Sequence, residues 1–254
     1  MKGLLTVVGL GPGDPRYLTP AASEALASAT DLVGYGPYVD RVPERPGQRR
    51  HSSDNRVELD RARFALDLAA KGARVAVVSG GDPGVFAMAA AVFEAVESGD
   101  PEWRSLDIRV EPGITAMLAA AARVGAPLGG DFCAVSLSDN LKPWEVVEAR
   151  LRAALTADFV VAFYNPISSA RPWQLGAALK LVAETRKPDT PVILARAVMR
   201  PDERIAILPL SEVEASMADM STIVIIGATT TRRIERPEGE APYVYTPRFY
   251  GVRT

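Results

Sequence analysis

Short apolar runs alternate with segments of helical spacing along the first half of this chain. Four runs bounded by turn residues predict β-strands, at 4–10, 31–35, 73–78 and 106–111. Apolar residues recur at a helical period over 20–29, 56–71, 84–97 and 113–124. Asn55 and Glu58 have the spacing of a capping box at the start of the second helix, and Gly72 ends it. Continuous apolar strands separated by helices are typical of a parallel or mixed sheet covered on both faces.

A segment rich in glycine and proline, RVGAPLGGDF at 123–132, interrupts this pattern and is interpreted as a linker. Further strands are predicted beyond it at 132–138, 158–165, 190–198, 204–210 and 221–228, with helices at 143–156 and 171–186. Only a short helix at 211–217 separates the last two strands, which favours some antiparallel pairing. From Thr229 onward the chain is polar, rich in proline and expected to be irregular. The sequence therefore predicts two α/β domains, at 1–124 and 125–254.

The composition narrows the class of protein. A chain of 254 residues is long enough for two such domains, and 48% hydrophobic and 24% charged residues are ordinary for a soluble globular protein. A formal net charge of −2 argues against a nucleic-acid partner. The one cysteine, Cys133, cannot form an intrachain disulfide, so a cytoplasmic location is expected. No apolar run approaches the roughly 20 residues of a membrane-spanning helix, and no His/Cys/Asp cluster has the spacing of metal ligands.

Two glycine-rich turns follow predicted strands, GLGPGDP at 9–15 and SGGDPG at 79–84. A dinucleotide fingerprint fails because the third glycine comes one residue early, prolines remove N–H donors, and the next acid, Asp31, precedes its strand. Asp82 would repel phosphate but attract a cation, and its alternative role is to cap a helix opened by Pro83. Ligands of open α/β sheets bind at the carboxyl ends of strands. The turns therefore suggest a cationic, nucleoside-like ligand without phosphate, such as S-adenosylmethionine.

The motifs VVGLGPGDPRYLT, VVSGGDPGVF, VEPGITA and IVIIGA occur in the order found in the tetrapyrrole (precorrin) methyltransferases, a family that the chain resembles over nearly its whole length. Three more stretches, GYGPYVDRV, VSLSDNLKPW and FYNPISSARPWQLGAA, resemble the members that methylate C17 and contract the ring. The resemblance implies two α/β domains with the active site in the cleft between them, S-adenosylmethionine as cofactor, and a homodimer. The implied reaction is methylation of C17 of precorrin-3B, with contraction to precorrin-4, in cobalamin biosynthesis.

The resemblance also implies which residues contact the cofactor. They are Leu10, Pro12, Gly80, Gly81, Asp82, Val85, Thr115, Ala116, Tyr164, Ala197 and Ala228. A precorrin carries acetate and propionate carboxylates, which an arginine fork with hydroxyl and amide groups is suited to bind. The candidate substrate ligands are Arg171, Asn165, Ser168 and Ser169, each with the alternative role of starting or capping a helix. The arginines of the predicted loop 41–56 are either a second clamp or solvated side chains.

Ring contraction needs a base if a hydroxyl at C20 becomes a carbonyl as a ring carbon migrates. The candidates are Asp139, Tyr164, Asp14 and His51, and no spacing singles one out. His51 is the only histidine, and its place in an arginine-rich predicted loop favours a solvated side chain over a catalytic one.

Several other functions stay open at the level of the sequence. The same fold would serve a cobalt-bearing factor III in the anaerobic route, or methylation at another position of a precorrin. A nicotinamide oxidoreductase is disfavoured by the glycine spacing. A non-enzymatic tetrapyrrole carrier would have no need of two glycine turns that hold a cofactor.

Overall fold

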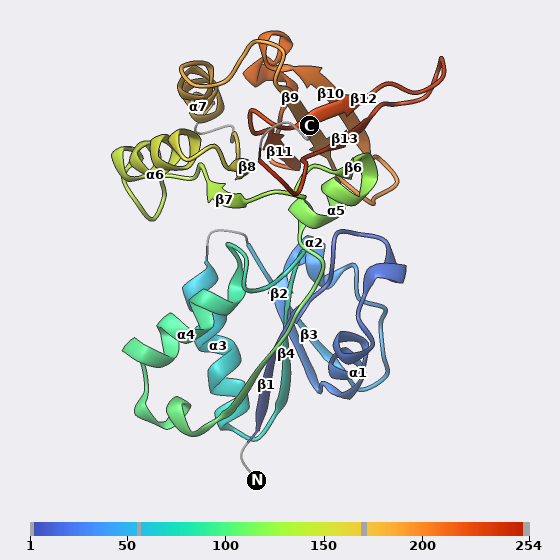
Figure 1. The fold of residues 1–254 in the computed structure, drawn as a ribbon. Coiled ribbons are helices and arrows are strands. Elements are labelled where there is room, and N and C mark those ends of the chain that lie inside the picture. Colours follow the sequence, from blue (N-terminus) through green and yellow to red (C-terminus); the bar gives the residue numbers. More distant parts are fainter. Residues whose placement is uncertain (1–2, 55–56, 169–171, 251–254) are drawn as a thin grey trace. The chain divides into compact units, whose positions relative to one another are not determined.

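The computed structural model describes residues 3–54, 57–168 and 172–250. The chain divides into two compact α/β units, Met1–Thr115 and Ala116–Thr254 (Figure 1), which is the predicted fold class. The division lies ahead of the boundary predicted at 124, because helix α5 (Ala116–Val124) contacts strands of the second unit. No helix of the described residues is long and apolar enough to cross a membrane.

Unit 1 is built on a five-stranded sheet in the order β3-β2-β4-β1-β5, and every neighbouring pair is parallel. The strands are β1 (Leu4–Gly9), β2 (Asp31–Tyr35), β3 (Arg49–Ser53), β4 (Arg74–Ser79) and β5 (Asp107–Glu111). The helices are α1 (Pro20–Ser28), α2 (Gly36–Val39), α3 (Glu58–Ala70) and α4 (Met88–Ser98), with 3-10 turns at Pro15–Tyr17 and Pro101–Ser105.

Alternate residues of the unit 1 strands enter two separate cores. Val8 of β1 packs in a cluster with Leu26 of α1, whereas the neighbouring Val7 packs in a second cluster with Leu66 of α3 and Val92 of α4. Successive side chains of a strand point to opposite faces, so α1 covers one face of the sheet while α3 and α4 cover the other. The predicted sheet with both faces covered is confirmed.

Unit 2 is built on a mixed sheet in the order β10-β9-β11-β8-β7. The strands are β7 (Phe132–Ser136), β8 (Val160–Tyr164), β9 (Pro191–Arg196), β10 (Arg204–Pro209) and β11 (Thr222–Ile226), and the helices after α5 are α6 (Trp144–Thr156) and α7 (Gln174–Ala183). Strand β11 is antiparallel to both of its neighbours, β8 and β9, so β7, β8 and β9 end at the same edge. Two 3-10 turns, Leu210–Glu212 and Ala215–Met217, replace the short helix predicted there.

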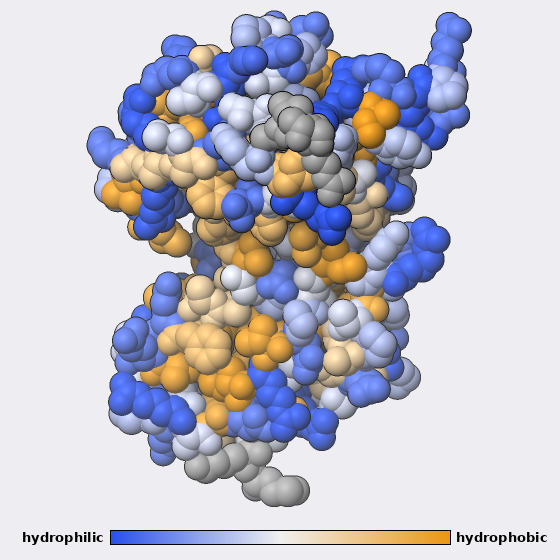
Figure 2. All heavy atoms as spheres, in the orientation of Figure 1, coloured by the Kyte–Doolittle hydropathy of each residue, from blue (hydrophilic) through white to orange (hydrophobic). Residues whose placement is uncertain are grey.

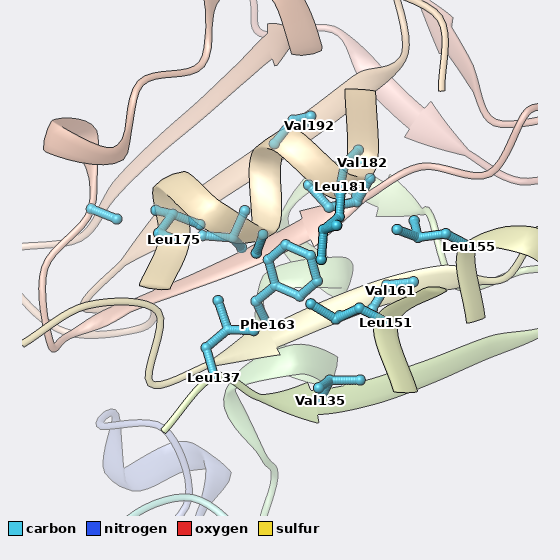
Figure 3. Close-up of a cluster of buried hydrophobic side chains, with 14 of the residues drawn as sticks. Val135, Leu137, Leu151, Leu155, Val161, Phe163, Leu175, Leu181, Val182 and Val192 are labelled. Carbon is cyan, nitrogen blue, oxygen red and sulfur yellow. The ribbon is translucent and has the colours of Figure 1, made fainter. Parts of the chain in front are cut away.

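Figure 3 shows how the core of unit 2 forms between this sheet and α6 and α7. Phe163 of β8 is fully buried and lies at the centre, with Leu137 from the loop after β7 beside it. Leu151 of α6 and Leu175 of α7 pack in the same cluster and are also fully buried. These contacts pack both helices against the sheet.

The predicted linker and the predicted irregular tail are both wrong in part, because they pair with each other. Gly125–Ala126 forms strand β6, which is parallel to β13 (Tyr243–Tyr245), and β13 is antiparallel to β12 (Arg232–Ile234). The Thr246 hydroxyl donates to the Pro127 carbonyl at 2.6 Å. Strands of two or three residues are too short to show an apolar alternation, so the hydrophobic pattern did not predict them.

Several predicted helix starts are too early. Helix α3 begins at Glu58 with Val57 as a cap residue that makes no side-chain bond, and the expected cap Asn55 lies outside the described residues. Helix α4 begins at Met88 rather than Gly84, and α5 at Ala116 rather than Gly113. In both of these cases the glycine-containing turn before the helix makes contacts with another loop.

The arginine-rich segment predicted as a loop contains edge strand β3. Arg49–Ser53 pairs in parallel with the whole of β2, and His51 lies opposite Val33. Polar residues occupy this strand because it lies at the edge of the sheet, where side chains stay partly exposed. The expectation of a solvated loop for His51 is therefore wrong.

Candidate active site

Three glycine-containing loops of unit 1 pack backbone against backbone beyond the carboxyl ends of β1, β4 and β5. The N–H of Gly11 donates to the carbonyl of Gly81 at 3.1 Å, and the N–H of Gly81 donates back to the carbonyl of Gly11 at 2.9 Å. Both residues have positive φ, +64° and +66°, which favours glycine. A Cβ on Gly113 would lie 2.2 Å from the Gly81 carbonyl oxygen. The two turns noted in the sequence thus form one surface, together with the EPGI loop.

Asp82 ties two of these loops together. Its Oδ1 accepts the N–H of Gly84 at 2.8 Å, and its Oδ2 accepts the N–H of Gly113 at 3.0 Å. Helix α4 begins at Met88 and is preceded by Ala87, so the proposed helix-capping role of Asp82 is wrong. The half-buried carboxylate instead fixes the distance between the GGDP turn and the loop after β5.

Arg41 holds the first glycine loop from the other side. One of its guanidinium nitrogens donates to the carbonyls of Leu10 and Gly11, at 3.0 Å each. Arg50 likewise donates to the carbonyls of Val39, which ends α2, and of Val42. Arg49 pairs with Asp31 at 2.8 Å. Among the predicted arginine clamps, these three are therefore committed to the protein itself. Arg45 is exposed, and Arg56 lies outside the described residues.

Unit 1 brings together most of the residues expected to contact the cofactor. They are Leu10, Pro12, Gly80, Gly81, Asp82, Val85 and Thr115, all on the three loops. Leu10 and Thr115 are buried, at 6% and 7% exposure. A Cβ on Gly80 would lie 2.7 Å from the Tyr38 ring, so the ring leaves room only for bare backbone there. These loops present mainly backbone groups, which suits the positioning of a ligand by shape.

Unit 2 brings together three further residues of that prediction. Tyr164 ends β8 and Ala197 follows β9, at the edge where both strands end. The Tyr164 hydroxyl accepts the N–H of Met117 at 3.1 Å, which places the start of α5, and hence Ala116, beside it. Ala197 is 4% exposed and has a φ of +47°, an uncommon value for a residue with a side chain.

Ala228 lies at the opposite edge of the same sheet. It follows β11, whose antiparallel direction takes its carboxyl end toward the amino ends of β8 and β9. Its N–H donates to the Thr231 hydroxyl at 2.9 Å, and the residue is 5% exposed. The structure therefore does not bring Ala228 together with Tyr164 and Ala197.

Two of the four candidate substrate ligands are described, and neither caps a helix. Asn165 follows β8 with a φ of +50°, and its amide donates to the Ser136 hydroxyl at 3.0 Å. The Ser168 hydroxyl is buried and has no partner among the described residues. Helix α7 begins at Gln174 after Trp173, with no side-chain cap, so the capping alternative is wrong for both. Arg171 and Ser169 lie outside the described residues.

The four candidate bases differ in their surroundings. Asp14 caps the Pro15–Tyr17 turn and pairs with Arg16, accepting the Arg16 N–H at 2.9 Å. Asp139 accepts the Gln174 amide at 3.1 Å, and Tyr164 accepts the Met117 N–H. His51 lies 2.8 Å from Asp31, which is the first residue of β2. This contact lies toward the amino ends of the strands, whereas the glycine loops lie beyond their carboxyl ends.

Asp31 organises a charged cluster at the amino end of β2. Its side chain is fully buried and accepts hydrogen bonds from Thr30 and Arg49, both at 2.8 Å, besides its contact with His51. Burial raises the pKa of Asp31, but the bonds from Arg49, His51 and Thr30 lower it, and the net pKa is below its ordinary value. The His51 ring also packs edge-on against Phe64, with centroids 5.1 Å apart. The cluster joins β2 to the edge strand.

Sequence reasoning missed Tyr38, and it assigned Arg41 to a candidate substrate clamp and not to the glycine loops. Both residues belong to the GYGPYVDRV stretch. Only the paired loops make the roles visible, since each side chain contacts backbone far away in the sequence.

Among the described residues there is no group of three or more His, Cys, Asp and Glu that could hold a metal ion.

Comparisons with known proteins agree with this arrangement. A model of the family described as Tetrapyrrole (Corrin/Porphyrin) Methylases matches residues 4–214. The chain is 60% identical to a precorrin-3B C(17)-methyltransferase of Sinorhizobium sp, over 98% of each chain. It is 39% identical to a probable cobalt-factor III C(17)-methyltransferase of Salmonella typhimurium, over 90% of this chain and 94% of that one. A crystal structure of the methyltransferase CobJ matches with a TM-score of 0.92 at 54% identity, covering 96% of this chain and 100% of that one.

The chain belongs to the tetrapyrrole (corrin/porphyrin) methylase family, as its motifs predicted. It is a methyltransferase of cobalamin biosynthesis, and its methyl donor is S-adenosylmethionine. The nicotinamide oxidoreductase and the non-enzymatic carrier are therefore wrong as classes of function.

Proposed function

We propose that this chain methylates C17 of precorrin-3B and contracts the macrocycle to precorrin-4. The observation that carries the proposal is the identity of 60%, over 98% of each chain, with the Sinorhizobium precorrin-3B C(17)-methyltransferase. The stretches that resemble the C17-methylating members lie at defined places in the fold. VSLSDNLKPW spans the end of β7, the loop after it and the first residue of α6. FYNPIS, the start of the second stretch, covers the end of β8 and the residues that follow it, at the same end of the parallel pair β7 and β8.

The three glycine loops of unit 1 fit the cofactor. Gly81 and Gly11 hold each other through paired backbone hydrogen bonds, and Gly113 leaves no room for a side chain against Gly81. The backbone groups of such a surface have little freedom to move, so they hold a bound ligand in a defined position. When bound, S-adenosylmethionine supplies an electrophilic methyl group. The chain's own contribution there is alignment, which the links made by Asp82 and Arg41 maintain.

The carboxyl edge of the unit 2 sheet fits the carboxylates of the substrate. Tyr164 ends β8, and an amide from Asn165 and the buried hydroxyl of Ser168 follow it. Neutral donors of this kind hydrogen-bond acetate and propionate groups without the cost of burying a second charge. Arg171 remains our proposed fork for one of these carboxylates, by the resemblance.

Cobalt-factor III is the competing substrate. The 39% identity with the Salmonella protein supports it less well than the 60% identity supports precorrin-3B. The cobalt would belong to the substrate. The stretches that resemble the C17-methylating members give no comparable support for methylation at another position of a precorrin.

We also propose a cytoplasmic homodimer, on two observations. Phe64 of α3 and Phe93 of α4 are 44% and 50% exposed, and Figure 2 shows apolar residues gathered over these helices. Exposed apolar patches on soluble proteins commonly mark contacts with another chain. The free thiol of Cys133 is half-buried, and burial raises its pKa, which suits a protein without disulfides.

The substrate proposal is tested by parallel incubation with S-adenosylmethionine and either precorrin-3B or cobalt-factor III. Formation of S-adenosylhomocysteine is followed at several substrate concentrations. We expect the higher kcat/KM with precorrin-3B. A higher value with cobalt-factor III would move the chain to the anaerobic route and overturn the proposal.

A further inference from the structure

The loop between β7 and α6 folds back on itself and presents Lys142. The Lys142 Nζ donates to the Ser138 carbonyl at 3.1 Å. The backbone N–H groups of Ser138 and Asn140 donate to the hydroxyls of Ser136 and Ser138, at 3.4 Å each. The amine is therefore held within a few residues of the end of β7. Asn165, which bonds Ser136, lies at the same edge of the sheet.

The loop is also anchored to α7. Gln174 is 2% exposed, and its amide nitrogen donates to Asp139 at 3.1 Å. Its amide oxygen is buried without a partner among the described residues. The Trp144 and Trp173 rings meet edge to face nearby, with centroids 4.7 Å apart. Lys142 thus belongs to a loop that Asp139 joins to α7.

The candidate bases named from the sequence serve this role less well. Asp14 is paired with Arg16, and His51 contacts Asp31 toward the amino edge of the unit 1 sheet. The Asp139 carboxylate and the Tyr164 hydroxyl accept hydrogen bonds from Gln174 and Met117. Lys142 contributes an amine nitrogen at the same edge as Tyr164, and a free amine is a stronger base than a carboxylate.

The surroundings of Lys142 favour the loss of its proton. Burial lowers the pKa of its ammonium group, and the positive charge of Arg150 on α6 lowers it further. Asp139 on the same loop raises it, but the net pKa is below the ordinary lysine value. More of the side chain is therefore in the free amine form near neutral pH than for a solvated lysine.

We propose that Lys142 accepts the hydroxyl proton during ring contraction, an inference that rests on the proposed function. The proton passes to Nζ, which becomes an ammonium, and the O–H electron pair forms the second bond of a new carbonyl. The bond between this carbon and one ring neighbour breaks, and its pair forms a bond between the two ring neighbours, which shortens the ring by one atom. The neighbour that receives the pair releases its bond to an oxygen leaving group with both electrons. Electrons and atoms balance without an added oxidant.

The test compares Lys142→Ala and Lys142→Arg with wild type, and with Lys180→Met as a control on the exposed side of α7. Substrate binding is measured by fluorescence or absorbance titration, and contraction by the ketone carbon of the product in 13C NMR. We expect both Lys142 variants to bind precorrin-3B and to form the ketone about 100-fold more slowly, since proton transfer contributes a factor of this order. Added ethylamine restores the rate of the Ala variant and not that of the Arg variant.

Contraction within threefold of wild type in both variants would overturn the assignment. Full activity of Lys142→Arg alone would also overturn it, because the side chain would then act only as a positive charge that binds a carboxylate. Failure of ethylamine to restore an Ala variant that binds substrate also counts against a proton acceptor. If wild type itself forms no S-adenosylhomocysteine with precorrin-3B, the proposed function fails instead.

Discussion

The Asp82 carboxylate accepts a hydrogen bond from the backbone N–H of Gly113 at 3.0 Å, although 31 residues separate them. This contact links the turn after β4 to the loop after β5, and the other carboxylate oxygen stabilises the turn itself through Gly84. The negative charge of Asp82 therefore faces backbone donors. The residue shapes the proposed cofactor surface chiefly through geometry.

Asp82→Asn tests this interpretation. An asparagine keeps one oxygen but turns an NH2 group toward one of the two N–H donors, so one hydrogen bond is lost. We expect a loss of about 1–2 kcal/mol in the free energy of unfolding and weaker binding of cofactor. Calorimetric titration is expected to show the same factor of loss for S-adenosylmethionine and S-adenosylhomocysteine. A loss confined to the charged ligand would mean that Asp82 attracts the sulfonium directly.

Gly81→Val tests the paired glycine loops. The native φ of +66° strains any β-branched residue, by about 1–3 kcal/mol. We expect a lower melting temperature and at least tenfold weaker binding of S-adenosylmethionine. Gly47→Val is the matched control, because Gly47 has a φ of +79° and no atoms around the position of a Cβ. If both variants bind the cofactor like wild type, the loops are not the cofactor surface.

The Asp31 cluster predicts a specific pH dependence. The lowered pKa of Asp31 means that its bonds stabilise the fold above the unfolded-state pKa of about 3.9. This stability is lost as the pH falls through the lower pKa of the folded state. Asp31→Asn should lose about 1–3 kcal/mol at pH 7 and show a weaker acid dependence in urea unfolding. An unchanged acid dependence would show that Asp31 does not make this contribution.

His51→Ala separates structure from catalysis. The ring contacts Asp31 and Phe64 toward the amino edge, so we expect reduced stability with turnover within a few-fold of wild type. Steady-state kinetics and thermal melting measure the two effects. A loss of turnover of about 100-fold in a folded variant would instead assign proton transfer to His51.

The dimer is tested by light scattering at micromolar concentration. We expect a mass of about twice the 27.1 kDa of one chain. Phe93→Asp places a charge on the exposed face of α4 and should give the monomer, whereas Met220→Asp, at another exposed apolar position, should not. A wild-type monomer would refute the homodimer, and a dimeric Phe93→Asp variant would place the contact elsewhere.

Much of the fold could be predicted because its strands are continuous apolar runs. Strand β2 has the predicted bounds, 31–35, and other predicted strands of both sheets differ by only one or two residues at their ends. Strand β3 was missed because RRHSS has no apolar pattern and is held by pairing with β2 and by Asp31. The hydrophobic periodicity of a segment reports the burial of its own residues. A strand that is held in place by a distant segment therefore cannot be predicted from it.

The part of the candidate site that could be predicted is the part where glycines mark a close approach between two backbone segments. Gly11 and Gly81 were recognised as turns, but their mutual hydrogen bonds were not visible from either segment alone. The resemblance implied that Ala228 contacts the cofactor together with Tyr164, and the antiparallel direction of β11 separates the two residues. Strand direction depends on tertiary pairing, which a single sequence does not encode locally.

The most direct test of the account is the product formed from precorrin-3B and S-adenosylmethionine carrying a 13C-labelled methyl group. The purified chain is incubated with both, and the product is examined by mass spectrometry and NMR. We predict one labelled methyl group on C17 and a macrocycle shortened by one carbon, with the extruded carbon as a ketone. A label at any other ring carbon, or a methylated product whose ring is still of the original size, would contradict it.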